Sequence, residues 1–250
     1  MRCLIISKKQ IKLFLAVALV LVTAVFGTIG VFAGNERRIP IYSVENNKKQ
    51  IAISFDAAWG ADDTDELIEI LGEYKVKATF FVVGDWVDKY PEEVKKLSDA
   101  GHRVENHSNS HPYMTKISSE EKLKELNICN EKIKAITNRA PKLFRPPYGD
   151  YDNATIEAVE SIGMYTIQWS VDSLDWQENA TAGSIIQNCT NRTKEGDIIL
   201  CHNDAEFTPD ALPSILEKLQ SDGFEFVLIE DLIYKENYII DHTGRQLKGQ

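Results

Sequence analysis

The sequence predicts an α/β fold in which a parallel sheet or barrel of strands is covered by helices. From residue 50 onward, short apolar runs rich in β-branched and aromatic residues alternate with amphipathic runs of helical length. Repeated strand-then-helix order favours parallel strands with the helices outside. At 250 residues the chain fits one large domain of this kind.

Three of the expected helices have a sequence signal at one or both ends. Residues 62–71 carry aspartates in the first turn, which the helix dipole favours, and residues 91–100 begin at a proline and end before Gly101. Ser118 and Glu121 form a capping-box pattern that opens a long helix to about residue 136. The expected strands are 51–56, 78–83, 102–105, 143–144, 165–171, 197–201 and 225–229, and the remaining helices are 153–162, 184–193 and 209–221.

The N-terminus carries an uncharged apolar run at residues 13–33, preceded by four basic residues and no acidic one. The run is long enough to cross a hydrocarbon core of roughly 30 Å with its basic flank on the cytoplasmic side. Its end at Ala33 also resembles a cleavage site, so residues 1–33 are either a signal anchor or a signal peptide. We therefore expect a domain on the extracytoplasmic face of the membrane, or a secreted one. Its expected parts are a linker at 34–49, a domain at 50–235 and a polar tail at 236–250.

Charge and cysteine content exclude several classes of function. The formal net charge is −10, and every acidic residue follows position 33. Such a surface repels nucleic acid, offers no patch for anionic lipid, and accepts a neutral or cationic substrate more easily. The four cysteines, Cys3, Cys129, Cys189 and Cys201, match no zinc or redox spacing, so we expect buried thiols rather than a disulfide framework.

Polar residues follow the carboxyl ends of several expected strands, where parallel α/β proteins assemble their sites. They are Asp56, His107, Arg145, Asp172, Asp175 and His202. His107 and His111 are four residues apart, so both imidazoles can bind one divalent cation. Taken alone, such a pair is more often a surface or capping feature, and Asp56 could merely cap the next helix. The convergence of so many strand ends favours a metal-assisted hydrolytic site.

Five motifs in this order resemble those of the polysaccharide deacetylase family, also called the NodB homology family or carbohydrate esterase family 4. They are Ser54-Phe55-Asp56, His107-Ser108-Asn109-Ser110-His111, Arg145-Pro146-Pro147-Tyr148, Asp172-Ser173-Leu174-Asp175-Trp176 and Leu200-Cys201-His202. The run from Phe55 to Gly60 is most similar to a membrane-anchored, sporulation-associated subgroup. The resemblance implies a distorted (β/α) barrel with fewer than eight strands. It also implies removal of acetyl groups from a sugar polymer such as peptidoglycan, chitin or xylan.

The resemblance also implies a role for each site residue. Asp56 would be the base that activates water, held by Arg145, and His202 would be the acid that protonates the leaving amine. Asp175, together with Asp172, would tune that acid. The remaining implied roles are a divalent metal on His107 and His111, an oxyanion contact from the backbone N–H of Tyr148, and a pocket wall at Trp176. Zinc is the expected metal, with cobalt or manganese as alternatives. Neither an organic cofactor nor a partner protein is implied.

One position departs from the family pattern. Ala57 stands where a second aspartate usually ligates the metal, and a methyl group cannot ligate. The metal would then have only His107, His111 and water, unless Asp56 itself swings in as a ligand or Asp62 or Asp63 substitutes because their loop folds back. Three functions remain open: a deacetylase with an altered metal shell, a glycan-binding or structural pseudoenzyme, and a hydrolase of non-glycan acyl groups. Trp59 and Trp86 are expected to serve packing, and Trp176 could also be a core aromatic.

Overall fold

The computed structural model describes residues 36–249, within which one compact unit begins at Arg38. The expected signal anchor or signal peptide at 13–33 lies outside the described residues, as does Cys3. Among residues 36–249, no helix has both the length and the apolar character needed to span a bilayer.

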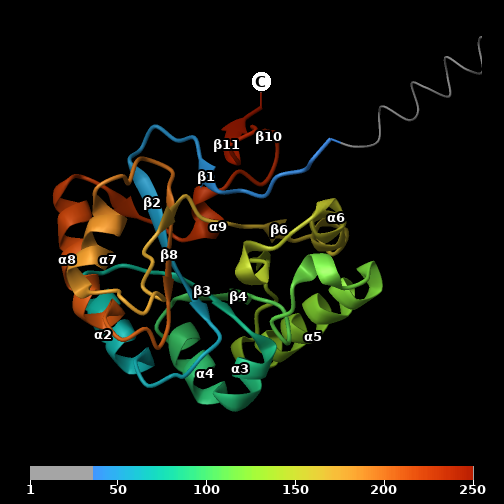
Figure 1. The fold of residues 1–250 in the computed structure, drawn as a ribbon, viewed down its shortest axis with the longest axis horizontal. Helices are drawn as coiled ribbons and strands as arrows, with labels where there is room; N and C mark the ends of the chain where they lie inside the picture. The colour runs from blue at the N-terminus through green and yellow to red at the C-terminus, as the bar shows by residue number, and fades with distance from the viewer. Residues whose placement is uncertain (1–35, 250) are drawn as a thin grey trace, which may run out of the picture. The chain divides into compact units, whose positions relative to one another are not determined.

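A parallel sheet forms the centre of this unit, with the strand order β6-β5-β4-β3-β2-β8-β7 (Figure 1). The strands are β2 (Gln50–Ala57), β3 (Thr79–Val82), β4 (Arg103–Asn106), β5 (Leu143–Phe144), β6 (Tyr165–Thr166), β7 (Val171–Asp172) and β8 (Ile198–His202), with β9 (Glu225–Phe226) beside β2. Strand β2 is buried along almost its whole length, as expected for a strand with parallel partners on both sides. The prediction of a parallel α/β sheet is confirmed.

The helices contribute apolar faces to the core around this sheet. They are α2 (Thr64–Glu73), α3 (Gly84–Lys89), α4 (Pro91–Asp99), α5 (Ser119–Thr137), α6 (Asn153–Ser161), α7 (Ala182–Thr190), α8 (Thr208–Ser221) and α9 (Ile229–Leu232). The largest apolar cluster joins β2, β3 and β8 to α2, α4, α7 and α8. The predicted capping box at Ser118 and Glu121 is present at the start of α5. Helix α3 was not expected, and the predicted strand 225–229 is a two-residue strand that runs into α9.

The expected strand 165–171 is instead two short strands at opposite ends of the sheet order. Strand β6 pairs with β5, whereas β7 pairs with β8, so residues 167–170 cross from one end of the sheet to the other. The N-terminal segment joins this crossing, because the backbone N–H of Ile41 donates to Thr166 and that of Gln168 donates to Ile41. The crossing brings the two ends of the sheet together, and the result is a curved half-barrel.

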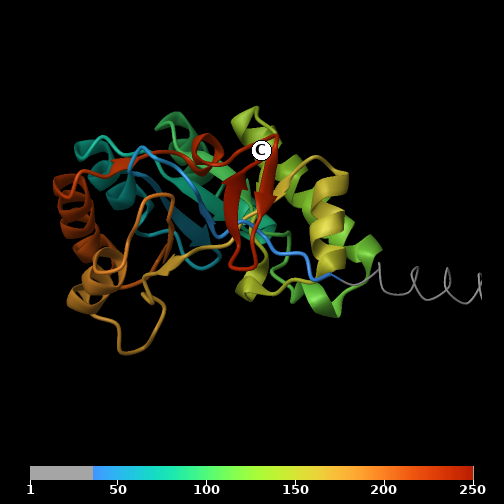
Figure 2. The same ribbon diagram turned by 90° about the horizontal axis from the view of Figure 1, so that it is seen from above.

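The segments predicted as a linker and a polar tail pair with each other. Strands β1 (Ser43–Val44), β11 (Arg245–Lys248) and β10 (Tyr238–Ile240) form a second sheet (Figure 2). Gly244 turns the hairpin with a positive φ of 84°, and a Cβ there would lie 2.3 Å from the Tyr42 ring. The compact unit therefore extends beyond the expected limits of 50–235 on both sides. Residues 236–250 were interpreted as a polar tail, although β10 is the apolar run Tyr-Ile-Ile.

The three cysteines within residues 36–249 are buried and free, as predicted. Cys129 lies on α5, Cys189 on α7 and Cys201 on β8.

Candidate active site

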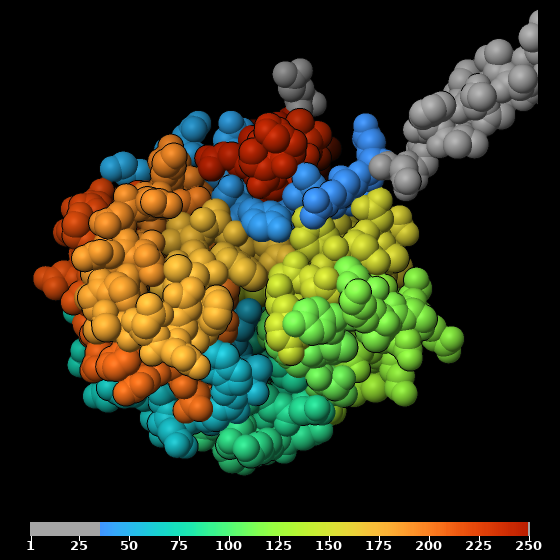
Figure 3. Space-filling model, viewed as in Figure 1, coloured from blue at the N-terminus to red at the C-terminus, as the bar shows by residue number. Residues whose placement is uncertain are grey.

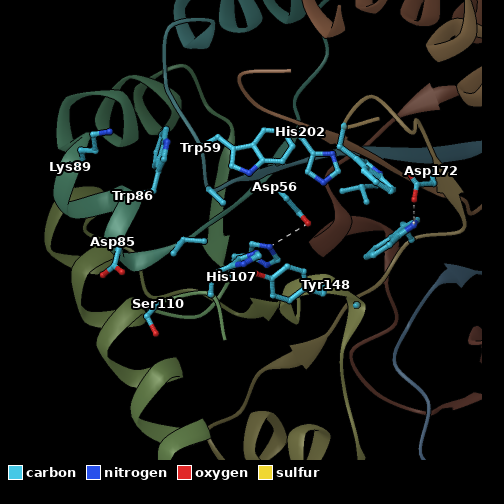
Figure 4. A pocket seen from close by; sticks show the side chains of 17 residues that line it. Asp56, Trp59, Asp85, Trp86, Lys89, His107, Ser110, Tyr148, Asp172 and His202 are labelled. Carbon is cyan, nitrogen blue, oxygen red and sulfur yellow. Dashed lines mark hydrogen bonds and ion pairs between the residues drawn. The ribbon is translucent and has the colours of Figure 1, made fainter. Parts of the chain in front are cut away.

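A pocket of about 770 Å³ opens at the carboxyl ends of the strands. Figure 3 shows the molecule hollowed where the cyan, green-to-yellow and orange segments meet, and Figure 4 shows the lining side chains. All but two of the predicted site residues line this pocket: Asp56, His107, His111, Tyr148, Asp172, Trp176 and His202. The other two, Arg145 and Asp175, lie behind it and contact Asp56 and His202.

Asp56 ends β2 as a buried carboxylate paired with a buried arginine. Arg145 donates from Nη1 to Oδ1 of Asp56 at 2.7 Å. Its Nη2 donates to the hydroxyl of Ser54 at 2.9 Å and to the carbonyl of Gln168 at 3.2 Å. Burial opposes the charge on Asp56, but the charge and hydrogen bond of Arg145 outweigh burial and lower the pKa of Asp56. The carboxylate therefore stays ionised at neutral pH, as a base must.

His107 and His111 face the pocket as neutral imidazoles. Nδ1 of His107 lies 2.7 Å from the carbonyl of Arg145, which can only accept, so Nδ1 carries the proton and Nε2 a lone pair. That Nε2 lies 3.5 Å from Oδ2 of Asp56. The two rings are 4.9 Å apart between centroids. Burial lowers the pKa of both rings, that of His111 to about 4, so both are free of the proton that would block metal binding.

The donor set does not fit a divalent metal held by three protein ligands. Ala57 is 1% exposed and belongs to the apolar core, so its position supplies no ligand. Asp63 accepts from the backbone N–H of Asp204, and neither Asp62 nor Asp63 lines the pocket, so the loop does not supply the missing ligand. Over residues 36–249, no group of three or more His, Cys, Asp or Glu side chains is arranged to hold a metal. Asp56 is already paired with Arg145, so the chain offers two imidazoles as metal ligands.

His202 ends β8 with its ring fixed by a buried carboxylate. Asp175 lies 2.7 Å from Nδ1 of His202 through Oδ1, while Oδ2 accepts from the backbone N–H of His202 at 2.8 Å. The hydroxyl of Thr208 donates to the same Oδ2 at 2.7 Å. Burial opposes protonation of His202, but the hydrogen bond and charge of Asp175 outweigh it and raise the pKa of the imidazole. This ring can hold a proton near neutral pH and present it from Nε2.

Asp172 and the aromatic residues form the outer part of the pocket. Asp172 accepts from Nε1 of Trp169 at 3.2 Å and from the backbone N–H of Leu174 at 2.9 Å. It therefore influences His202 through charge at longer range than Asp175 does. Trp176 is 52% exposed and Tyr148 59% exposed, so both are wall residues, and the alternative of Trp176 as a core aromatic is wrong. Tyr148 has a positive φ of 59° and its ring packs edge-on against His111.

Several functional neighbours were missed by the reading of the sequence. Ser54 and Gln168 hold Arg145, and Thr208 holds Asp175. Ser54 could have been found, because it lies two residues before Asp56 and so faces the same side of β2. Trp59 was interpreted as a packing residue, yet it is 46% exposed and lines the pocket.

Comparisons with known proteins agree with this geometry. Residues 43–167 match the model of the family described as polysaccharide deacetylase. A peptidoglycan-N-acetylglucosamine deacetylase of Bacillus cereus is 36% identical, over 77% of this chain and 92% of that protein. A peptidoglycan-N-acetylmuramic acid deacetylase of Bacillus subtilis is 34% identical over 76% of this chain, which spans only 40% of that protein.

This chain is also similar to the solved structures of a pseudoenzyme. The crystal structure of a CE4 family pseudoenzyme from Bacillus anthracis superposes with a TM-score of 0.75 at 33% identity, covering 78% of this chain and 69% of that chain. A mutant of that pseudoenzyme, described as having restored enzymatic activity, also superposes with a TM-score of 0.75, at 34% identity. The match covers 78% of this chain and 71% of the mutant. Motifs, half-barrel and relatives all agree that the chain belongs to the polysaccharide deacetylase family.

Proposed function

We propose that this chain is a hydrolase that removes acetyl groups from N-acetylated cell-wall glycan such as peptidoglycan, with a metal shell altered by Ala57. The observation that carries the proposal is the pairing of Asp56 with Arg145 and of His202 with Asp175 around one pocket. A buried arginine–carboxylate pair and a buried carboxylate–imidazole pair cost desolvation energy. A module that only binds sugar needs neither.

The chemistry follows from the protonation states of these groups. Asp56 is ionised and takes a proton from a water molecule in the pocket as that water attacks the acetyl carbonyl. His202 is protonated and gives its proton to the nitrogen of the departing sugar amine. The backbone N–H of Tyr148 is the proposed donor to the oxygen of the tetrahedral intermediate. A divalent metal such as zinc, if held by His107 and His111, would polarise the carbonyl.

A second function has support of its own. Ala57 removes a carboxylate from the metal shell, and the pseudoenzyme of Bacillus anthracis has the same fold at 33% identity. The pocket would then bind N-acetylated glycan through its exposed aromatic walls without hydrolysis.

The location of the protein is a further part of the proposal. The apolar run at 13–33 would place the domain on the extracytoplasmic face of the membrane as an anchor, or release it after Ala33. A role in the spore envelope rests on the motif from Phe55 to Gly60. Cell fractionation with expression measured through growth and sporulation tests both, and expression confined to vegetative growth would contradict the spore role.

The deciding experiment measures acetate release by the full chain from peptidoglycan strands and chito-oligosaccharides. It is run in chelator and with added zinc, cobalt or manganese. Release that depends on metal and disappears in Asp56→Asn supports the hydrolase. Absence of release under every metal, from folded protein that still binds the oligosaccharides, supports the pseudoenzyme instead.

A further inference from the structure

The indole of Trp59 lies flat against the imidazole of His202 at the pocket rim. The ring centroids are 5.3 Å apart and the ring planes differ by 16° (Figure 4). A tryptophan placed for packing would be covered by its neighbours, whereas this one is 46% exposed. The contact with His202 is therefore a more direct account of its position than core packing.

The loop that carries Trp59 is fixed to the loop that follows His202. The carbonyl of Gly60 accepts from Nε1 of Trp86 at 2.8 Å and from Nδ2 of Asn203. The backbone N–H of Gly60 donates to Oδ2 of Asp204 at 3.0 Å. A Cβ at Gly60 would lie 2.4 Å from that carboxylate oxygen, so a larger residue there would displace the Asp204 side chain. These bonds hold Trp59 in place over His202.

The charge on His202 depends on all the groups that face it. Asp175 contacts Nδ1, Asp56 and Asp172 favour the imidazolium at longer range, and His107 and His111 face the same pocket as neutral rings. The π face of an indole attracts a cation placed over it, and tryptophan does so most strongly among the aromatic side chains.

We propose that Trp59 is a positioning residue for His202. The indole stabilises the imidazolium form through its π face and keeps the ring in the rotamer that turns Nε2 toward the pocket. Asp175 fixes the ring at its Nδ1 edge, and Trp59 fixes it on one face, so two independent contacts define its orientation. The kinetic consequence of this inference rests on the proposed function, but its effect on His202 does not.

The test follows the pKa of His202 by NMR titration of histidine-labelled full chain, with His202→Gln used to assign the resonance. Trp59→Leu should lower this pKa by about half a unit, from the size of a cation–π contact at a partly exposed site. Trp59→Phe should keep most of the effect, because it retains a π face. Tyr113→Leu is the matched control, since Tyr113 is a half-exposed aromatic that stacks on Tyr148 instead of His202.

An unchanged pKa of His202 in Trp59→Leu, with the other histidine resonances in place, would overturn the proposal and leave Trp59 as a sugar platform or a packing residue. Because the titration needs no substrate, it decides the matter even if the chain proves inactive. If the chain is active, the alkaline limb of its rate profile should move to lower pH by the same half unit in Trp59→Leu. A change in KM alone, with that limb fixed, would contradict positioning and support sugar stacking.

Discussion

Replacing Arg145 by methionine should destabilise the fold mainly by stranding the charge of Asp56. Arg145 is fully buried and Asp56 is 6% exposed, so water in the pocket replaces the lost partner only in part. Ser54 keeps its own hydrogen bond to the carbonyl of Ile199, so its loss is small. Breaking a buried ion pair from one side costs about 3–5 kcal/mol, and we expect a decrease of this size in the free energy of unfolding at neutral pH.

The loss of stability in Arg145→Met should depend on pH. In the natural chain the lowered pKa of Asp56 contributes stability above about pH 4, which is lost as pH falls through the folded-state pKa. In Arg145→Met, burial acts on Asp56 without its counter-charge and raises that pKa. The folded variant then holds the proton more tightly than the unfolded chain does. The free energy of unfolding that Arg145→Met loses relative to the natural chain should therefore be largest at neutral pH and decrease as the pH is lowered toward 4.

Urea denaturation followed by circular dichroism, in chelator, measures both effects. The double variant Asp56→Asn/Arg145→Met is the control, because it removes the charge and its partner together. It should recover about 2 kcal/mol or more of the loss. If the single and the double variant lose the same free energy of unfolding, the reasoning is refuted, because the loss would then come from the missing packing of the arginine.

Three further predictions concern other parts of the chain. His102 accepts a hydrogen bond from the backbone N–H of Ala78, and burial with nearby Lys77 lowers its pKa to about 4. Stability should therefore fall by up to about 3 kcal/mol as pH drops from 6.5 toward 4, and urea titrations should show a flatter profile in His102→Gln. Asp175→Asn should lower the pKa of His202 by about 1–2 units in an NMR titration, and an unchanged value would deny Asp175 its tuning role. Gly60→Ala should cost about 1–3 kcal/mol by crowding Asp204, whereas Gly72→Ala, which has open space in α2, should gain about 0.5–1 kcal/mol in the same thermal unfolding assay.

The parts of the site that the sequence predicts are those tied to strand ends. Asp56 and His202 each close a buried parallel strand, and neighbouring parallel strands in register place such residues side by side. Arg145 directly follows β5 and its guanidinium reaches back under Asp56. These positions depend on local order along the chain, which an apolar pattern records.

The parts that escaped prediction depend on contacts between distant segments. Residues 165–171 form one apolar run, yet β6 and β7 pair with different neighbours because Ile41 inserts its backbone beside the crossing. The hairpin of β10 and β11 is stabilised by β1, about two hundred positions earlier, so the sequence near the hairpin does not indicate its partner. Trp59 was interpreted as a packing residue, because its contact with His202, which belongs to β8, cannot be inferred from the sequence around it.

Ala57→Asp should have two opposing effects, because it buries a carboxylate in the core and adds a metal ligand to the site. The side chain at 57 is 1% exposed and packs in the apolar core, so a carboxylate there should cost about 1–3 kcal/mol in chelator unless it finds a partner. Zinc should reverse that loss if the new carboxylate joins His107 and His111, because a ligand that binds only the folded state stabilises it. Thermal unfolding with and without zinc, on Ala57→Asp and on Ala57→Asn, separates ligation from tolerance of a polar group. If zinc stabilises the natural chain as much as it stabilises Ala57→Asp, two imidazoles already suffice, and Ala57 does not limit metal binding.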